Sequence, residues 1–207
     1  MSYDYIKRGL DVMLASSALV LSLPVQVVVA VLVARKLGRP VLFKQARPGR
    51  GGRIFTLVKF RTMANAAPAD SGVDADASRL SAFGQKLRST SLDELPTLIN
   101  VLKGDMSMVG PRPLLVQYLP RYTPEQARRH DVRPGVTGLA QVKGRNAIGW
   151  GEKFALDNEY VRNRSLVLDG KILFWTIAAV IRRDGVSAEN HVTTHEFMGN
   201  AEGAGSE

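Results

Sequence analysis

The longest apolar segment of the chain lies near its N-terminus, where Val12–Ala34 carries no charged residue. It is longer than the ~20 residues that a helix needs to cross a bilayer, and it has no polar face. Pro24 stands near its middle and cannot donate a backbone hydrogen bond to the carbonyl of Val20, so the helix is expected to bend there. The hydroxyl of Ser22 is placed to satisfy a freed carbonyl.

Both ends of this segment are basic, with the cations Lys7, Arg8, Arg35, Lys36 and Arg39. Because positive charge stays on the cytoplasmic side of a membrane, a straight span would export one of the two clusters. A re-entrant helix that enters the bilayer and returns keeps both inside, and each half would reach about 17 Å, roughly half of the hydrocarbon core. The pattern favours this re-entrant helix over a kinked single span. A cleaved signal peptide and a buried soluble helix fit it less well.

Two short β-prone runs follow, Pro40–Phe43 and Ile54–Phe60, and the basic, turn-rich segment Lys44–Arg53 separates them. This arrangement predicts a β-hairpin with a basic tip. The next segment, residues 64–77, is rich in Ala, Pro, Asp and Gly. That composition predicts a mobile acidic loop after the hairpin.

Helical spacing of apolar residues is found in four further segments: Leu92–Leu102, Pro124–His130, Trp150–Asn163 and Ile172–Ile181. The last is too short to span a membrane and has charged neighbours at both ends, so a helix on the membrane surface and an ordinary core helix are both consistent with it. Between these segments, Pro134–Gly138 is typical of a turn-rich loop and Leu139–Val142 of a short strand. The pattern predicts a mostly helical α+β fold with a small β-hairpin, a re-entrant N-terminal helix and amphipathic surface helices.

The charge balance changes this picture, because 28 Lys and Arg against 19 Asp and Glu give a formal net charge of +9. Such an excess indicates an anionic partner: a phosphate-bearing substrate, an acidic membrane or a nucleic acid. The chain has no cysteine, which excludes disulfides, iron–sulfur clusters and thiolate zinc sites, and 3 histidines, which disfavour a histidine-rich metal centre. With 2 Trp, 5 Tyr and 7 Phe the chain is poor in base-stacking residues, so we expect no nucleic-acid partner.

Two adjacent carboxylates, Asp93 and Glu94, stand at the start of the helix predicted over Leu92–Leu102. Ser91 and Glu94 have the spacing of a capping box, and Asp93 would favour the helix N-terminus, so one interpretation is purely structural. The other is catalytic. The apolar stripe turns both acids toward solvent, where a carboxylate pair can bind Mg²⁺ and present a nucleophilic oxygen. The metal would offset the repulsion between a carboxylate and an anionic substrate.

Several cations are candidates for binding substrate phosphates. Arg112 lies between two prolines that restrict its backbone, which suits its guanidinium to bidentate phosphate binding, although an ordinary ion pair is also consistent. Lys59 and Arg61 alternate along a predicted strand and would share one face of it. Arg145 follows a glycine that permits close approach of the backbone to a ligand.

The motifs of the chain are spread over most of its length: Tyr5–Arg8 with Asp11, Gln45–Gly49, Lys59–Met63, Ser91–Pro96, Asn100–Ser107, Val109–Leu114, Arg133–Val142 and Gly144–Ile148. Together they resemble the bacterial sugar transferases, and among these the single-domain, monotopic polyprenyl-phosphate phosphoglycosyltransferases of the PglC type. The resemblance covers roughly residues 3–199. The combination of the Asp-Glu-Leu-Pro, Gly-Pro-Arg-Pro and Arg-Pro-Gly-Val-Thr-Gly motifs makes it specific.

This resemblance implies transfer of a sugar 1-phosphate from a UDP-sugar to undecaprenyl phosphate with release of UMP, the first membrane step of glycoconjugate assembly. The expected sugar is an N-acetylated amino or deoxyamino sugar. Asp93 would attack the β-phosphate and form a covalent phosphosugar–aspartate. Glu94 would either bind Mg²⁺ together with Asp93 or act as a base in the second step. The substrate phosphates would be bound by Lys59, Arg61, Arg88, Arg112 and Arg145.

The family has a re-entrant N-terminal helix that is broken at a Ser-Pro pair. Here the pair is interrupted as Ser22-Leu23-Pro24, so the serine is displaced by one residue. We accordingly expect residues 1–39 to form a re-entrant membrane helix, residues 40–198 a catalytic domain with interfacial helices, and residues 199–207 a frayed tail. The protein would lie in the bacterial inner membrane, with the lipid bilayer as a partner and its catalytic domain on the cytoplasmic face.

Three other functions are weighed against this one. Hexose-1-phosphate transferases of the same family share these motifs, so the sugar stays open. A catalytically silent membrane adaptor would use the basic residues to bind anionic lipid, but it would not need an acidic pair beside a phosphate site. A nucleic-acid binder at the membrane agrees with the charge alone and not with the apolar N-terminus.

Overall fold

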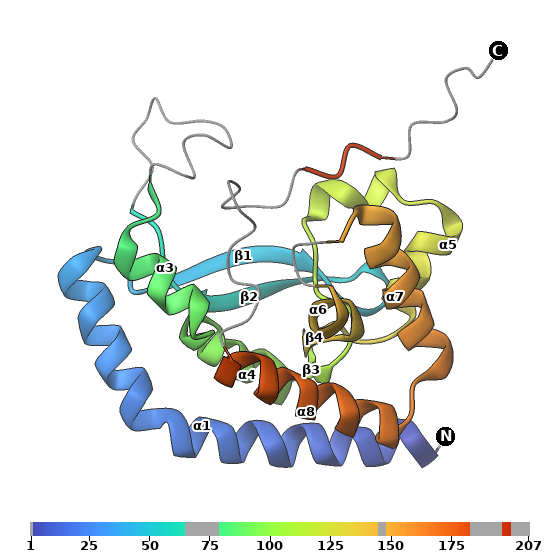
Figure 1. The fold of residues 1–207 in the computed structure, drawn as a ribbon, viewed down its shortest axis with the longest axis horizontal. Coiled ribbons are helices and arrows are strands. Elements are labelled where there is room, and N and C mark those ends of the chain that lie inside the picture. The colour runs from blue at the N-terminus through green and yellow to red at the C-terminus, as the bar shows by residue number, and fades with distance from the viewer. Residues whose placement is uncertain (1, 65–78, 145–147, 183–195, 200–207) are drawn as a thin grey trace.

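The computed structural model describes residues 2–64, 79–144, 148–182 and 196–199 (Figure 1). Helices predominate among these residues, and two small sheets of two strands each accompany them. The mostly helical α+β fold is therefore confirmed. The predicted acidic loop from residue 65 onward, Arg145 and the predicted tail from residue 200 onward lie outside the described residues.

The N-terminal apolar segment forms one long helix, α1 (Ser2–Lys36), with Pro24 inside it. Helical residues continue through the proline, but α1 bends near its middle: its first leg runs along the bottom of Figure 1 and its second leg turns upward. The bend expected from Pro24 is thus confirmed, whereas the break that the resemblance implies is not found, because the residues on both sides stay helical. Ser22 Oγ donates to the carbonyl of Ala18 at 2.5 Å instead of to that of Val20, and it accepts a hydrogen bond from Gln26 Nε2 at 2.9 Å.

Most of the apolar surface of α1 has no protein cover. Only 11% of its most apolar window is buried, and Val20 and Leu21 are 72% and 80% exposed. Among the described residues, α1 is the one helix with the length and composition to cross a membrane. A minority of its residues reaches the core, as where Val33 packs with Phe60 and Leu87.

The predicted hairpin is confirmed, with β1 (Leu42–Pro48) antiparallel to β2 (Ile54–Phe60) and Leu42 paired to Phe60. Its first strand is longer than predicted and takes in half of the segment that was assigned to the turn. The tip is a short 3-10 turn, Arg50–Gly52, in which two glycines adopt positive φ. Alternating side chains therefore place Gln45 and Arg47 on one face of β1.

The predicted helix over Leu92–Leu102 is split in two. A 3-10 helix, η2 (Leu92–Thr97), precedes α4 (Leu98–Lys103), and α3 (Ala82–Ser89) comes before both. Pro96 explains the split, because it has no N–H for the carbonyl of Leu92 and the chain winds more tightly there. The amide of Leu98 donates to the carbonyls of Leu95 and Pro96 as the chain enters α4.

A second sheet was not predicted. It pairs β3 (Ser107–Val109) in parallel with β4 (Gly135–Thr137), so the expected loop at Pro134–Gly138 contains a strand. A Cβ at Gly135 would lie 2.1 Å from the amide nitrogen of Gly110, which means that this glycine serves close strand packing and not a turn. The expected strand at Leu139–Val142 is a helix, α6 (Leu139–Lys143), because so short an apolar run does not reveal its period.

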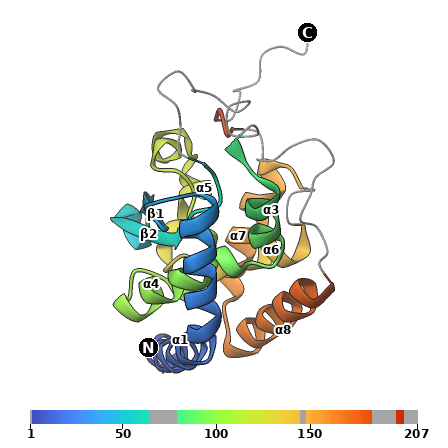
Figure 2. The same cartoon turned by 90° about the vertical axis from the view of Figure 1, so that its left-hand side faces the viewer.

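The remaining helical elements are η3 (Val116–Arg121), α5 (Pro124–Ala127), η4 (Arg128–Asp131), α7 (Trp150–Asn163) and α8 (Leu166–Arg182). The bounds of α7 agree with the prediction. On α8, Ile172 is fully buried in the core whereas Phe174 and Ile177 are 69% and 60% exposed. The helix therefore contributes to the core, as one interpretation expected, and its placement on a membrane surface stays a prediction. Figures 1 and 2 show α8 and the first leg of α1 side by side on one face of the molecule.

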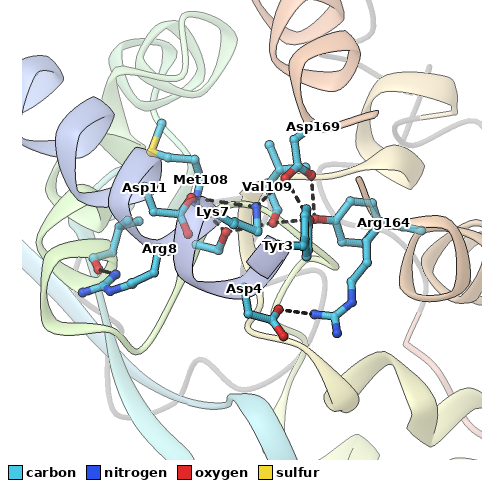
Figure 3. A network of polar contacts seen from close by, with 12 residues as sticks. Tyr3, Asp4, Lys7, Arg8, Asp11, Met108, Val109, Arg164 and Asp169 are labelled. Atoms are coloured by element: carbon cyan, nitrogen blue, oxygen red, sulfur yellow. Dashed lines mark hydrogen bonds and ion pairs between the residues drawn. The ribbon is translucent and has the colours of Figure 1, made fainter. Parts of the chain in front are cut away.

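A polar network fastens the start of α1 to the rest of the protein (Figure 3). The buried carboxylate of Asp169 accepts hydrogen bonds from Tyr3 at 3.0 Å, Lys7 Nζ at 2.9 Å and Tyr160 at 2.8 Å. Asp11 Oδ1 accepts the amide of Met108 at 2.9 Å. These contacts join α1 to α7, α8 and β3 and fix the direction in which its apolar first leg runs.

Candidate active site

The acidic pair does not form the capping box that its spacing allows. Ser91 has a positive φ of 55° and its side chain makes no cap hydrogen bond. Asp93 is 8% exposed and the side chain of Glu94 is 20% exposed, so the expectation that both acids face solvent is wrong. The tight winding of η2 before Pro96 turns the two carboxylates toward the β-hairpin instead.

The hairpin and the acidic turn are held together by buried side-chain hydrogen bonds. Asn100 accepts the amide of Val58 at 3.1 Å and donates to the carbonyl of Thr56 at 2.8 Å. Thr97 Oγ1 donates to the carbonyl of Val58 at 3.1 Å. These bonds occupy the edge of β2 and fix the register that places Lys59 opposite Glu94.

Glu94 forms the centre of the site. One of its oxygens, Oε1, accepts hydrogen bonds from Lys59 Nζ at 2.5 Å and from Arg112 Nη2 at 2.9 Å. Burial opposes the ionisation of Glu94, but the charges of Arg112 and Lys59 outweigh it and lower the pKa to about 2. Glu94 is therefore an anion that holds two cations in place.

Asp93 has the opposite environment. Burial, followed by repulsion from Glu94, raises its pKa to about 6. Within the part of the chain that the structure describes, no hydrogen bond or ion pair reaches its carboxylate. Arg88 from α3 lies close enough to lower this pKa and donates its own Nε to Thr62 Oγ1 at 3.1 Å. Of the two acids, Asp93 is thus the one whose carboxylate has no donor among the described residues.

Arg112 forms an ion pair with Glu94, and its guanidinium has further N–H donors that a ligand could accept. Its side chain is 45% exposed, and one Nη2 contact to Glu94 leaves further donors of the guanidinium for other acceptors. A cleft opens beside it, lined by Arg47, Leu57, Lys59, Glu94, Met106 and Arg112 among others. Both interpretations of Arg112, ion pair and phosphate ligand, therefore agree with the geometry.

Arg47 is a cleft residue that sequence reasoning missed. Burial and, after it, the charge of Arg112 lower its pKa to about 10. Its Nη2 donates to Gln45 Oε1 at 2.6 Å. The signal was present in the sequence, because Arg47 stands inside the Gln45–Gly49 motif.

The other predicted cations are placed differently. Arg61 is buried and donates to the carbonyls of Leu37 and Gly38, where it fastens the end of α1. The structure therefore brings Lys59, Asp93, Glu94 and Arg112 together, sets Arg88 beside Asp93, and directs Arg61 toward α1.

The donor set fits a magnesium ion shared with a substrate. No group of three or more His, Asp or Glu is found among the described residues, as a cage made by the protein alone would require. Mg²⁺ is commonly held by one or two carboxylates together with substrate phosphates. The unengaged carboxylate of Asp93 beside Glu94 matches that arrangement.

Comparison with known proteins identifies the family of the chain. The model of the bacterial sugar transferase family matches residues 2–183, and the chain belongs to that family. It is 53% identical over 170 residues to the uncharacterized sugar transferase EpsL of Bacillus subtilis (strain 168), covering 82% of this chain and 84% of EpsL.

Two longer relatives carry more specific names. The undecaprenyl-phosphate galactose phosphotransferase of Salmonella typhimurium is 38% identical over 201 residues, which cover 89% of this chain and 42% of that protein. The UDP-N-acetylgalactosamine-undecaprenyl-phosphate N-acetylgalactosaminephosphotransferase of Aeromonas hydrophila is 39% identical over 188 residues, which cover 86% and 44%. The chain thus spans less than half of either relative.

Proposed function

We propose that this protein transfers a sugar 1-phosphate from a UDP-sugar to undecaprenyl phosphate and releases UMP. The observation that carries the proposal is the unengaged carboxylate of Asp93 beside Glu94, which Lys59 and Arg112 hold as an anion. The names of the Salmonella and Aeromonas relatives describe reactions of this type. An acceptor buried in a bilayer and a water-soluble donor are well served by a covalent intermediate, which splits the transfer into two steps.

In the first step, an oxygen of Asp93 attacks the β-phosphorus of the donor. A new P–O bond forms, the bond between the β-phosphorus and the bridging oxygen breaks, and UMP leaves with that oxygen. In the second step, a phosphate oxygen of the lipid attacks the same phosphorus and the aspartyl P–O bond breaks, which restores the carboxylate. Lys59 and Arg112 stabilise the charge that builds up on the phosphoryl oxygens.

We further propose that Asp93 and Glu94 hold Mg²⁺ together with the donor diphosphate. When bound, the ion would neutralise phosphate charge and lower the repulsion that an attacking carboxylate meets. The low pKa of Glu94 makes it a weak base, and two cations already occupy one of its oxygens. We therefore assign Glu94 to holding Mg²⁺, Lys59 and Arg112, and not to proton transfer.

The membrane is the proposed second partner. The exposed apolar surface of α1 and the exposed side chains Phe174 and Ile177 of α8 belong to neighbouring helices on one face, as expected for a protein embedded on one side of a bilayer. With basic clusters at both ends of α1, we propose a re-entrant, PglC-type attachment to the bacterial inner membrane. The catalytic domain, residues 40–198, would then lie on the cytoplasmic face.

For the sugar we propose an N-acetylated amino or deoxyamino sugar, in line with the name of the Aeromonas relative. A hexose is the second candidate, because the Salmonella relative is named for galactose at similar identity. A silent adaptor is disfavoured, since an isolated membrane anchor has no need of a buried acid with a raised pKa.

The test is UMP release by the detergent-purified protein from a panel of UDP-sugars, with Mg²⁺ and undecaprenyl phosphate. We expect release that requires both the metal and the lipid, with one donor preferred. Asp93→Asn should abolish release and the covalent adduct. The control Glu159→Gln, which removes an exposed acid paired with Lys143, should leave both unchanged. Release that persists in Asp93→Asn, or is absent for every donor, would overturn the proposal.

A further inference from the structure

The backbone around Arg112 is held in an unusual way. Three consecutive carbonyls each accept a hydrogen bond from a different part of the fold. The carbonyl of Pro111 accepts the amide of Gly135 at 3.0 Å, and that of Pro113 accepts Arg47 Nη1 at 3.2 Å. The carbonyl of Arg112 itself accepts Arg129 Nη2 at 2.6 Å.

The middle contact comes from a buried ion pair. Arg129 in η4 is 3% exposed, and its Nη2 also forms an ion pair with Asp157 Oδ2 of α7 at 2.8 Å. The guanidinium lies against the rings of Phe154 and Tyr122, with its carbon 5.5 and 5.9 Å from their centroids. The same nitrogen thus donates to the carbonyl of Arg112 and pairs with the carboxylate of Asp157, and the guanidinium is held between this anion and the two rings.

A buried ion pair is an expensive way to stabilise a fold, because apolar residues of similar volume often do as well or better. The Arg129–Asp157 pair is therefore expected to have a role other than stabilising the fold. The hydrogen bond from Arg129 to the carbonyl of Arg112 indicates that role. Prolines on both sides already restrict the backbone of Arg112, and a fixed carbonyl removes most of the freedom that is left. Because the backbone of Arg112 is fixed, its side chain extends from a defined position toward Glu94 and a ligand.

We propose that Arg129, oriented by Asp157, is a positioning residue that fixes the backbone of Arg112 and so sets where the Arg112 guanidinium meets the diphosphate of the donor. This inference rests on the proposed function, since the diphosphate is that of the UDP-sugar. Arg129 makes no contact with substrate in this scheme. It acts through Arg112, and removing Arg112 should remove its effect.

A double-mutant cycle between Arg129→Lys and Arg112→Ala tests this, with UDP affinity by calorimetry and UMP release as the two measurements. Lysine keeps the positive charge. It lacks the planar guanidinium that contacts both the Arg112 carbonyl and Asp157 while lying against two aromatic rings. In the wild-type background we expect Arg129→Lys to weaken UDP binding and slow UMP release by about tenfold each. In the Arg112→Ala background the same change should cost less than about twofold.

Equal losses in both backgrounds would mean that Arg129 supports the fold and not Arg112, and would overturn the inference. If Arg129→Lys does not fold, Asp157→Asn enters the same cycle, since it frees Arg129 to turn without removing it. Glu159→Gln on the same helix is the matched control and should change neither measurement. A wild-type protein that neither binds UDP nor releases UMP overturns the proposed function and this inference together. An active wild-type protein in which Arg129→Lys causes the same fold loss with and without Arg112→Ala overturns the inference alone.

Discussion

Asp93 and Glu94 are neighbours in sequence and have opposite surroundings. Glu94 has two cations within hydrogen-bond distance, whereas Asp93 is buried beside a like charge and has no donor within the described part of the chain. Such a separation is characteristic of reactive carboxylate pairs, in which one acid reacts and the other organises the site. The cost of keeping Asp93 ionised should be visible in the stability of the protein.

We predict that Asp93→Asn leaves the thermal midpoint unchanged or raises it in the absence of Mg²⁺ and donor at pH 8. The folded state raises the pKa of Asp93 to about 6, above its ordinary value, so its ionised form disfavours folding at that pH and an amide removes the penalty. Glu94→Gln should instead lower stability by about 1–3 kcal/mol, because it leaves Lys59 and Arg112 without their anion. Thermal unfolding in detergent compares the two. An equal loss in both variants would contradict the distinction.

A second prediction concerns acid stability and His130. Its Nδ1 lies 3.2 Å from the carbonyl oxygen of Gly49, and burial, with the charge of Arg129, lowers its pKa to about 4. Between about pH 6.5 and 4 the unfolded chain therefore binds a proton that the folded protein does not, so stability falls as the pH falls through this window. Unfolding midpoints of His130→Gln should fall less than those of the wild type between pH 7 and 4.5. Parallel curves would show that folded His130 takes up the proton freely.

Among the elements, the hydrogen bonds of Asn100 matter most for the site, because they fix η2 and α4 against β2. This side chain is 1% exposed and satisfies both the amide of Val58 and the carbonyl of Thr56. Thr97 adds one bond to the carbonyl of Val58. The register of Lys59 against Glu94 depends on these contacts.

We predict that Asn100→Ala costs about 2–4 kcal/mol of unfolding free energy, since it leaves two buried backbone groups without partners. Thr97→Val removes a single hydroxyl donor and keeps the shape, so it should cost about 1 kcal/mol. Denaturant unfolding of both variants measures the difference. Equal costs would mean that the strand edge finds other partners and that Asn100 does not set the register.

The elements that the sequence predicted well have long or regular patterns. Trp150–Asn163 and Ile54–Phe60 have such patterns, and their bounds agree with the structure. The failures are short and depend on distant contacts. Gly135–Thr137 lies in a segment with the composition of a turn, but Gly135 permits the close approach of β3, and no local pattern reveals that. Leu92–Thr97 has helical spacing, yet Pro96 changes its winding and turns the acids inward.

The same distinction applies to the site. Lys59, Asp93, Glu94 and Arg112 were predicted from motifs, and the structure brings them together. Their partners were not predictable from spacing, because Glu94 meets Lys59 only through the hairpin register. Arg129 was not among the predicted site residues, although it is buried and donates to the carbonyl of Arg112. Contacts between segments far apart in the chain leave no periodic trace in a single sequence.

On the scale of the whole molecule, most of the exposed large apolar side chains of the described residues belong to α1 and α8. The first leg of α1 and α8 lie side by side on one face, and the network around Asp169 ties their ends together (Figure 3). Because Lys7 is bound to Asp169, the basic start of α1 is fixed to the catalytic domain. The other end of α1 is fastened to the same domain by Arg61. Both ends of the apolar helix are therefore anchored to one body.

This anchoring leads to a prediction about membrane topology. If both ends of α1 stay with the catalytic domain, Tyr5 and Arg39, which are both exposed, lie on the same side of the bilayer. The chain has no cysteine, so Tyr5→Cys and Arg39→Cys give single reporters without further changes, and exposed Lys86→Cys on α3 marks the side of the catalytic domain. An impermeant thiol reagent applied to sealed vesicles of either orientation should label all three together. A straight span would put one reporter on the opposite side and pull either Lys7 from Asp169 or Arg61 from the end of α1. Labelling of Tyr5→Cys and Arg39→Cys from opposite sides would therefore refute both the re-entrant attachment and the fixed arrangement of the two ends.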